Sequence, residues 1–209
     1  MLVWPPSGST LKRAVLGSAF LIIAAAEPDQ SHMIFGMELG KPVSIAPCPR
    51  KVLANGMASD FLFDTTDPAE ICFEPDIQLR DAPWRRGAFS FPLKRVPLIM
   101  SGNTGLTLIL DGKLEGIQID TLGYSHAEGI VRELSAKYGK PLHVDPTQST
   151  VSGIPVPSIE AVWQVRGVFV RYLSVDGSVE TGSLWVESTK MHSVRAEWTR
   201  KQARAREPL

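Results

Sequence analysis

The chain has 209 residues, of which 44% are hydrophobic and 21% are charged, a composition typical of a globular protein rather than a disordered one. Its 22 basic residues are balanced by 22 acidic residues, so there is no overall basic field of the kind that attracts nucleic acid or anionic membranes. The composition therefore predicts one ordinary domain or two small lobes, and it argues against a nucleic-acid-binding protein.

The first 26 residues have the three parts of a secretory signal peptide. Lys12-Arg13 precede an apolar run from Ala14 to Ala26, and the small residues Ala24-Ala25-Ala26 come directly before Glu27. A basic region, an apolar region and a cleavage site follow one another in this order in signal peptides. The run is shorter than the about 20 residues that span a bilayer. We therefore expect cleavage near Ala26, a mature chain with no membrane span, and a periplasmic or secreted location.

The mature chain would contain two cysteines, Cys48 and Cys72. In an oxidising compartment an even pair of cysteines predicts a disulfide, and closing a loop of this length contributes roughly 3.5 kcal/mol in the chain-entropy model. Two free buried thiols and a metal-binding pair are the alternatives. No CxxC motif and no histidine at ligand spacing supports the metal.

Residues 27–102 are interpreted as a Pro-rich lobe that the disulfide holds together. Each proline removes a main-chain donor and fixes φ, so only short strands are expected in this region. Candidate strands are Met33–Leu39, Phe61–Phe63 and Ile71–Phe73. The sequence leaves open whether the lobe is separate or adds strands to the rest of the protein. The nine prolines are at positions 28, 42, 47, 49, 68, 75, 83, 92 and 97.

Residues 103–209 predict a β-β-α-β-β-β order. Asp111-Gly112 is a strong hairpin signal between apolar stretches, and Arg166-Gly167 separates two alternating segments in the same way. A further turn is expected at Asp176-Gly177. The expected strands are Leu106–Leu110, Leu114–Thr121, Val162–Val165, Val168–Leu173 and Ser183–Glu187. This order predicts an α+β fold, mainly an antiparallel sheet with one principal helix packed on one face.

The predicted helix has a marked start and end. Ser125 and Glu128 match the S-x-x-E capping box, and Gly139 followed by Pro141 is a typical helix end. The apolar stripe has helical spacing and consists of Ala127, Ile130, Val131, Leu134 and Tyr138.

The tail from Thr199 to Leu209 carries four arginines and lysines: Arg200, Lys201, Arg204 and Arg206. It is either a docking patch for an acidic partner or anionic lipid, or a solvated helix end or frayed terminus.

Ser125 also lies in a segment similar to a nucleophile elbow, Gly123 to Ala127, between a strand and a helix. Asp176 and His192 follow in the order of a Ser-Asp-His triad, with His192 as base and Asp176 orienting it. A hydrolase sheet needs several βα units and an HGGG-type segment, which the sequence lacks, and a capping role accounts for Ser125. We therefore predict no catalytic residue, with a serine hydrolase as the alternative.

His143 and Asp145 can share one face of an extended segment, but two ligands do not complete a metal site. No metal and no cofactor are expected. Trp84-Arg85-Arg86 lie in a polar, loop-like stretch, and Trp with Arg is typical of protein-binding hot spots. These three residues are the predicted partner-binding site, unless Trp84 simply folds over the edge of the lobe.

Several segments together resemble small uncharacterised exported proteins of proteobacteria: Phe35–Pro42, Asp111–Ile117, Lys137–Pro141 and Ala161–Trp163. The resemblance implies a periplasmic location and an α+β fold, and it carries over no catalytic residue. Our hypothesis from the sequence is a non-enzymatic periplasmic interaction or binding module with a protein partner. A third possibility is an inhibitor or immunity protein that blocks a partner enzyme through the loop around Trp84.

Overall fold

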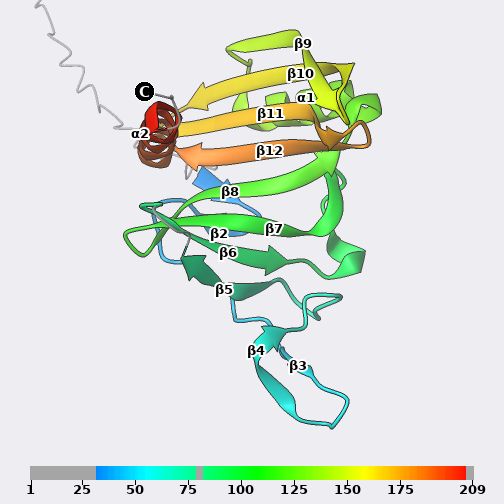
Figure 1. Ribbon diagram of the computed structural model, residues 1–209, viewed down its shortest axis with the longest axis vertical. Coiled ribbons are helices and arrows are strands. Elements are labelled where there is room, and N and C mark those ends of the chain that lie inside the picture. The colour runs from blue at the N-terminus through cyan, green and yellow to red at the C-terminus, as the bar shows by residue number, and fades with distance from the viewer. Residues whose placement is uncertain (1–31, 79–81, 206–209) are drawn as a thin grey trace, which may run out of the picture.

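A computed structural model describes residues 32–78 and 82–205, and its centre is one eight-stranded antiparallel sheet (Figure 1). The strand order is β5-β6-β7-β8-β12-β11-β10-β9. Two four-stranded meanders therefore meet where β8 pairs with β12, and helix α1 (Ala127–Tyr138) connects the first meander to the second. The strands are β5 (Cys72–Gln78), β6 (Arg85–Ser90), β7 (Met100–Leu110), β8 (Lys113–Leu122), β9 (His143–Val151), β10 (Ile154–Val165), β11 (Val168–Ser178) and β12 (Thr181–Ser188).

Two-residue turns join several neighbouring strands. Asp111-Gly112 and Arg166-Gly167 have positive φ at both positions, as the turns of tight hairpins require, so both predicted hairpins are confirmed. Ser152-Gly153 makes a third such turn. It joins β10 to β9, a strand that the sequence analysis missed because Pro146 and polar residues obscure its pattern. The turn expected at Asp176-Gly177 comes three residues later, at Val179-Glu180, since β11 continues to Ser178 and β12 begins at Thr181.

One face of the sheet is covered by α1, as predicted. The buried residues of its stripe are Ala127, Ile130, Leu134 and Tyr138, and Val131 is partly buried. They pack in one cluster with Trp163 and Tyr172 of the sheet, both 0% exposed. The indole N–H of Trp163 donates to the carbonyl of Gly139 at 3.1 Å, which ties the end of α1 to β10.

The predicted end of α1 is confirmed, but its predicted start is wrong. Gly139 has φ +80° and its N–H donates to the carbonyl of Ser135, as in a glycine C-cap. At the start, a 3-10 turn, η3 (Tyr124–His126), precedes the helix and makes His126 the N-cap. Ser125 therefore makes no capping bond, and its Oγ lies 3.0 Å from Nδ1 of His126.

The Pro-rich region contributes strands to the main sheet. Strand β5 pairs with β6, and β6 pairs with β7, so the sheet continues through residues 72–90 without a break between lobes. The predicted disulfide between Cys48 and Cys72 is confirmed. Two small two-stranded sheets complete the region: β1 (Met33–Ile34) with β2 (Met37–Glu38), and β3 (Arg50–Val52) with β4 (Ala58–Phe63). A short 3-10 turn, η2 (Leu93–Arg95), precedes β7.

Aromatic rings cover two glycines on the α1 face of this region. Phe89 lies opposite Gly105 in the β6–β7 register, and a Cβ at Gly105 would lie 2.3 Å from the Phe89 ring. A Cβ at Gly87 would lie 2.4 Å from the Phe73 ring. Each glycine therefore leaves room for an aromatic ring to lie flat on the strands, an arrangement that helps to set strand register.

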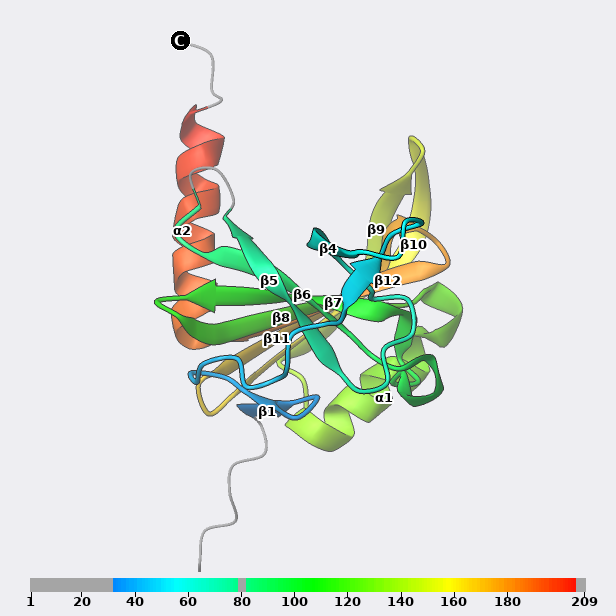
Figure 2. The same cartoon turned by 90° about the horizontal axis from the view of Figure 1, so that it is seen from below.

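Helix α2 (Thr189–Ala205) covers one end of the opposite face (Figure 2). Its buried Met191 packs with Leu108 and Leu110, and Trp185 lies against the same cluster. Val186, the next residue of β12, belongs to the α1 cluster. Consecutive strand residues point to opposite faces, so the two helices lie on opposite sides of the sheet. Neither α-helix of the described residues is long and apolar enough to cross a membrane.

The predicted β-β-α-β-β-β order has no second helix, so α2 is a correction to that order; the docking patch and the solvated helix end were the two alternatives considered for Thr199–Leu209, and α2 runs through this segment to Ala205. Its signals are present in the chain. The hydroxyl of Ser188 accepts the N–H of Met191 at 3.0 Å as an N-cap, and Met191, Val194 and Trp198 have the spacing i, i+3 and i+7. The many basic residues between them weaken this pattern.

Candidate functional site

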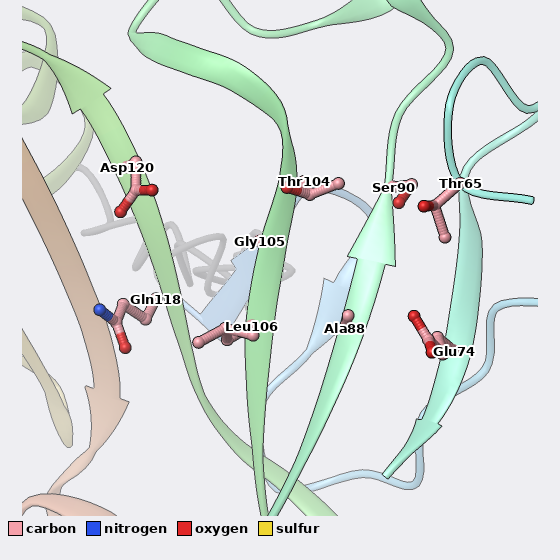
Figure 3. Close-up of a pocket in the computed structure, with 9 residues that line it drawn as sticks. All are labelled: Thr65, Glu74, Ala88, Ser90, Thr104, Gly105, Leu106, Gln118 and Asp120. Atoms are coloured by element: carbon pink, nitrogen blue, oxygen red, sulfur yellow. The ribbon is translucent and has the colours of Figure 1, made fainter. Parts of the chain in front are cut away.

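The part of the second sheet face that α2 leaves open contains a cleft of about 300 Å³ (Figure 3). Its floor consists of strands, because Glu74, Ala88, Leu106 and Gln118 are cross-strand neighbours in one row over β5 to β8. Side chains of one row project from the same face of a sheet. The remaining lining residues are Thr65, Ser90, Thr104, Gly105 and Asp120.

The loop that carries Thr65 is fixed against the sheet by Asn103. The amide nitrogen of Asn103 lies 3.2 Å and 3.0 Å from the carbonyl oxygens of Thr65 and Thr66, and 3.1 Å from that of Phe91. The carboxylate of Asp67 accepts the N–H of Leu93 at 2.8 Å. These bonds preorganise one rim of the cleft.

The strand that carries Glu74 is also held in place. Cys72 and Glu74 alternate with Phe73 and so share one face of β5. The disulfide to Cys48 therefore stands beside the cleft. Main-chain bonds join Phe73 to Ala46 and Cys48, both at 2.8 Å. This part of the chain covers the outer edge of β5 next to the site.

The cleft is acidic and offers mainly acceptors. Glu74 and Asp120 supply two carboxylates, and no lysine, arginine or histidine of the described residues lines it. Three inter-strand spacings of about 4.8 Å put β5 and β8 roughly 14 Å apart, and Figure 3 shows the two carboxylates on opposite sides. Ser90 is 0% exposed, and its hydroxyl has no hydrogen-bond partner among the described residues. A buried polar group without a partner is unfavourable.

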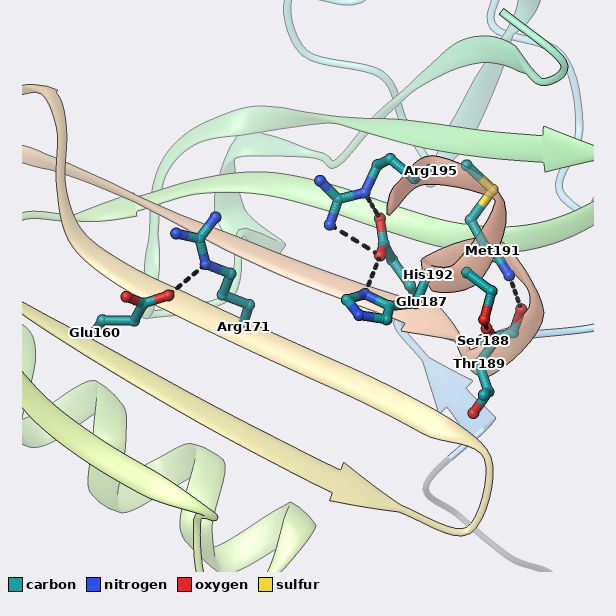
Figure 4. A network of polar contacts seen from close by, with 9 residues as sticks. Glu160, Arg171, Glu187, Ser188, Thr189, Met191, His192 and Arg195 are labelled. Carbon is teal, nitrogen blue, oxygen red and sulfur yellow. Dashed lines mark hydrogen bonds and ion pairs between the residues drawn. The ribbon is translucent and has the colours of Figure 1, made fainter. Parts of the chain in front are cut away.

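A buried ion pair holds α2 on the other end of this face (Figure 4). Glu187 at the end of β12 is 0% exposed. Its Oε1 lies 2.6 Å from Nε of Arg195, and its Oε2 accepts from Nη2 at 3.0 Å. Nδ1 of His192 lies 3.4 Å from the same carboxylate. The guanidinium also lies 4.7 Å from the centre of the Trp185 ring.

A second contact fixes the start of α2 to the β7–β8 turn. Lys190 donates to Asp111 at 2.7 Å. This hydrogen bond holds the pKa of Asp111 below its usual value and raises the pKa of Lys190. Both groups are exposed, so the contact orients the helix more than it stabilises the fold.

A wider groove of about 590 Å³ lies between α2 and strands β10 and β11. It contains Arg171 and Arg195, but each guanidinium is already paired with a carboxylate: Arg171 with Glu160 at 2.6 Å, and Arg195 with Glu187. The groove therefore presents no uncompensated charge from these arginines. The acidic cleft is the better candidate site for that reason.

The structure does not bring together Ser125, Asp176 and His192, the triad of the alternative serine-hydrolase interpretation. Ser125 lies beside Thr181 at the start of β12, and Asp176 is near the same end, since its carbonyl accepts from Thr181. His192 follows the other end of β12. That strand is roughly 23 Å long at about 3.3 Å per residue, so a histidine base cannot reach Ser125.

Packing explains why the same motif has a glycine at position 123. A Cβ at this position would lie 2.1 Å from the carbonyl oxygen of Val179, and that carbonyl accepts the N–H of Tyr124. The close approach of β8 to the β11–β12 turn therefore requires glycine. The likeness to a nucleophile elbow follows from this packing.

The predicted partner-binding residues differ in exposure. Trp84 is 2% exposed and contacts Trp198 of α2 edge to face, with the ring centres 5.2 Å apart. Arg85 is exposed and Arg86 is partly buried at the start of β6. Binding of a partner through the indole would require α2 to move, and partner binding by this segment stays a prediction.

His143 and Asp145, the candidate metal-ligand pair in the sequence, are both exposed. Nε2 of His143 lies 3.9 Å from Oδ2 of Asp145. Within residues 32–78 and 82–205, no group of three or more His, Cys, Asp or Glu side chains is placed to hold a metal ion. The signal peptide expected for residues 1–26 lies outside the described residues.

Comparison with family models, with curated proteins and with solved structures finds no match to this chain.

Glu74, Gln118 and Asp120 are not among the site residues predicted from the sequence. In β8 the polar residues Gln118 and Asp120 alternate with Ile117 and Ile119, which predicts a strand with one solvated face. That alternation does not reveal that the solvated face belongs to a cleft. The information comes from β5, β6 and the Thr65 loop, which are distant in sequence.

Proposed function

We propose that this protein is a non-enzymatic binding module of the exported compartment and that it holds a basic segment of a protein partner in the acidic cleft. The observation that carries the proposal is the cleft lining, which in the part of the chain that the structure describes consists of two carboxylates, one amide and three hydroxyls, with no basic side chain. Such a set favours a positively charged donor. A volume of about 300 Å³ is at the small end for ligand pockets, so a lysine or arginine side chain from a larger partner fits better than a whole cofactor.

The spacing of the carboxylates suggests how such a segment lies. An extended chain rises about 3.4 Å per residue, so side chains four residues apart are about 14 Å apart on one face. This matches the separation of β5 and β8. Asp120 lies two residues along β8 from Gln118, which shares a row with Glu74. Two lysines in positions i and i+4, whose long side chains can span this offset, can therefore approach Glu74 and Asp120 together.

The disulfide supports the exported location, since disulfides persist in oxidising compartments. The direct check of export is N-terminal sequencing of the protein recovered from the native host. The sequence is expected to begin at Glu27. A chain that keeps residues 1–26 would contradict cleavage.

Binding is tested with a Gly/Ser peptide that carries two lysines four residues apart, measured by isothermal titration calorimetry. The double variant Glu74→Gln, Asp120→Asn should weaken binding by up to about 30-fold, because each partly exposed ion pair contributes up to about 1 kcal/mol, a factor of about five. The control is Glu133→Gln, which makes the same change on the exposed side of α1. Binding that both variants leave unchanged would place the peptide elsewhere, and no binding at low salt would refute the proposal.

A further inference from the structure

Strand β9 ends the eight-stranded sheet, and its outer edge pairs with no described residue. The sheet's other edge is different. There the main chain around Pro47 pairs with Phe73 of β5. Unpaired main-chain groups on an edge strand are a template for another strand. The two edges of this sheet are therefore not equivalent, and only the β9 edge is left open along its length by the described chain.

The direction of the main-chain groups of β9 follows from its turn. Ser152-Gly153 forms a two-residue loop, so Val151 and Ile154 form the first hydrogen-bonded pair, and every second residue of β9 bonds to β10. Gln148 and Thr150 then point their N–H and C=O groups away from the sheet. The alternation is consistent on β10, where the N–H of Ile159 points to the other side and donates to Ser174 Oγ at 2.8 Å.

The last residue pair in the β10–β11 register is Glu160 with Leu173. Beyond it, residues 147–158 of β9 and β10 form a two-stranded arm (Figure 2). On the β10 side of this arm the outward positions are Pro155 and Pro157, which have no N–H. On the β9 side they are Gln148 and Thr150, which do. Proline thus blocks one edge of the arm, and the other edge keeps its donors.

We infer that β9 pairs with β9 of a second copy of this chain, antiparallel about a twofold axis at Ser149. In this register Gln148 lies opposite Thr150 of the second copy and Thr150 lies opposite its Gln148. Each pair exchanges two hydrogen bonds, so the edge is self-complementary, as a twofold interface must be.

Charge and length also favour a second copy. Residues 146–158 contain no charged side chain, so the paired strands bring no like charges together, and the lysines that commonly protect edge strands are absent. Ile154 beside this edge is 64% exposed. Pro146 ends the paired stretch in each copy. Both copies use the same β9 edge in this contact, so the twofold arrangement closes on itself and the association stops at a dimer.

The test is sedimentation equilibrium of the purified protein over a range of concentrations, with Thr150→Pro and Thr150→Val as a matched pair. Thr150→Pro removes one outward N–H per chain, and hence two hydrogen bonds per dimer. We expect it to raise the dimer dissociation constant about 30-fold, a factor of about five for each bond. Thr150→Val keeps the N–H and should change it less than about twofold.

Cross-linking identifies the interface. The described chain has no free cysteine, and directly opposed residues in a non-hydrogen-bonded pair are close enough for a disulfide. Ser149→Cys should therefore form a covalent dimer on oxidation, whereas Thr199→Cys on exposed α2 should not. A protein that remains monomeric at millimolar concentration overturns the inference. A dimer that Thr150→Pro leaves intact also overturns it. The inference is overturned as well if the protein is a monomer that captures a different protein and Thr150→Pro abolishes that capture, because the β9 edge then serves another partner. Far-UV circular dichroism of each variant confirms that it is folded.

Discussion

Replacing Arg195 with methionine should destabilise the protein strongly, because it removes the main partner of a fully buried carboxylate. Glu187 is 0% exposed and contacts Arg195 through both oxygens. Removing one partner of a buried ion pair typically costs 3–5 kcal/mol. We expect about 3 kcal/mol here, at the lower end, because His192 remains 3.4 Å from the carboxylate. For a domain of this size that free energy corresponds to a fall in Tm of about 6–12 °C.

The control uses the same substitution at a more exposed pair on the same face. Arg171 and Glu160 are paired at 2.6 Å, but their side chains are 40% and 29% exposed. Arg171→Met should therefore cost at most about 1 kcal/mol. The double variant Glu187→Met, Arg195→Met should recover most of the loss, since apolar residues often replace a buried pair at little cost.

The assay is urea unfolding followed by circular dichroism at pH 8. Equal losses for Arg195→Met and Arg171→Met would show that Glu187 is solvated in solution. So would a double variant as unstable as the single one. Either result would refute the reasoning.

Three further predictions concern the disulfide and the packing of the sheet. Replacing both cysteines of the disulfide with alanine should lower the free energy of unfolding by roughly 3.5 kcal/mol. It should also loosen the cleft rim, which is measured as faster amide exchange in residues 46–48 and 72–74. Unchanged amide exchange would show that the rim does not depend on the disulfide. Gly105→Ala places a methyl group 2.3 Å from the Phe89 ring and should lower the free energy of unfolding by about 1–3 kcal/mol. Gly102→Ala, with open space around the added methyl group, should have little effect. Thermal melts of the two variants check this difference. Burial raises the pKa of Tyr172 to about 12, so the folded state favours the protonated phenol and loses stability as the pH rises from the unfolded value near 10 towards 12. Tyr172→Phe should reduce this alkaline loss in urea titrations at pH 9 and pH 11, and an equal loss in both proteins would contradict it.

Much of the fold was predictable because its signals are local. The Asp111-Gly112 and Arg166-Gly167 turns, the apolar stripe of α1 and its end at Gly139 each depend on a few adjacent residues and on main-chain geometry. The Cys48–Cys72 pair was predictable because only one pairing of two cysteines is possible. In contrast, the capping role of Ser125 was wrong, since a 3-10 turn of three residues moved the helix start.

Local patterns in the chain were enough to predict an α+β protein with an antiparallel sheet, a helix on one face and one disulfide. Three features became visible only in the folded molecule: the Pro-rich region continues the sheet, α2 covers one end of the other face, and Glu74 and Asp120 line one cleft. The difference lies in how far along the chain the interacting residues are. Turns and helix stripes depend on neighbours along the chain, whereas the order of strands depends on pairing between segments distant in sequence, and that order places Glu74 on β5 opposite Asp120 on β8.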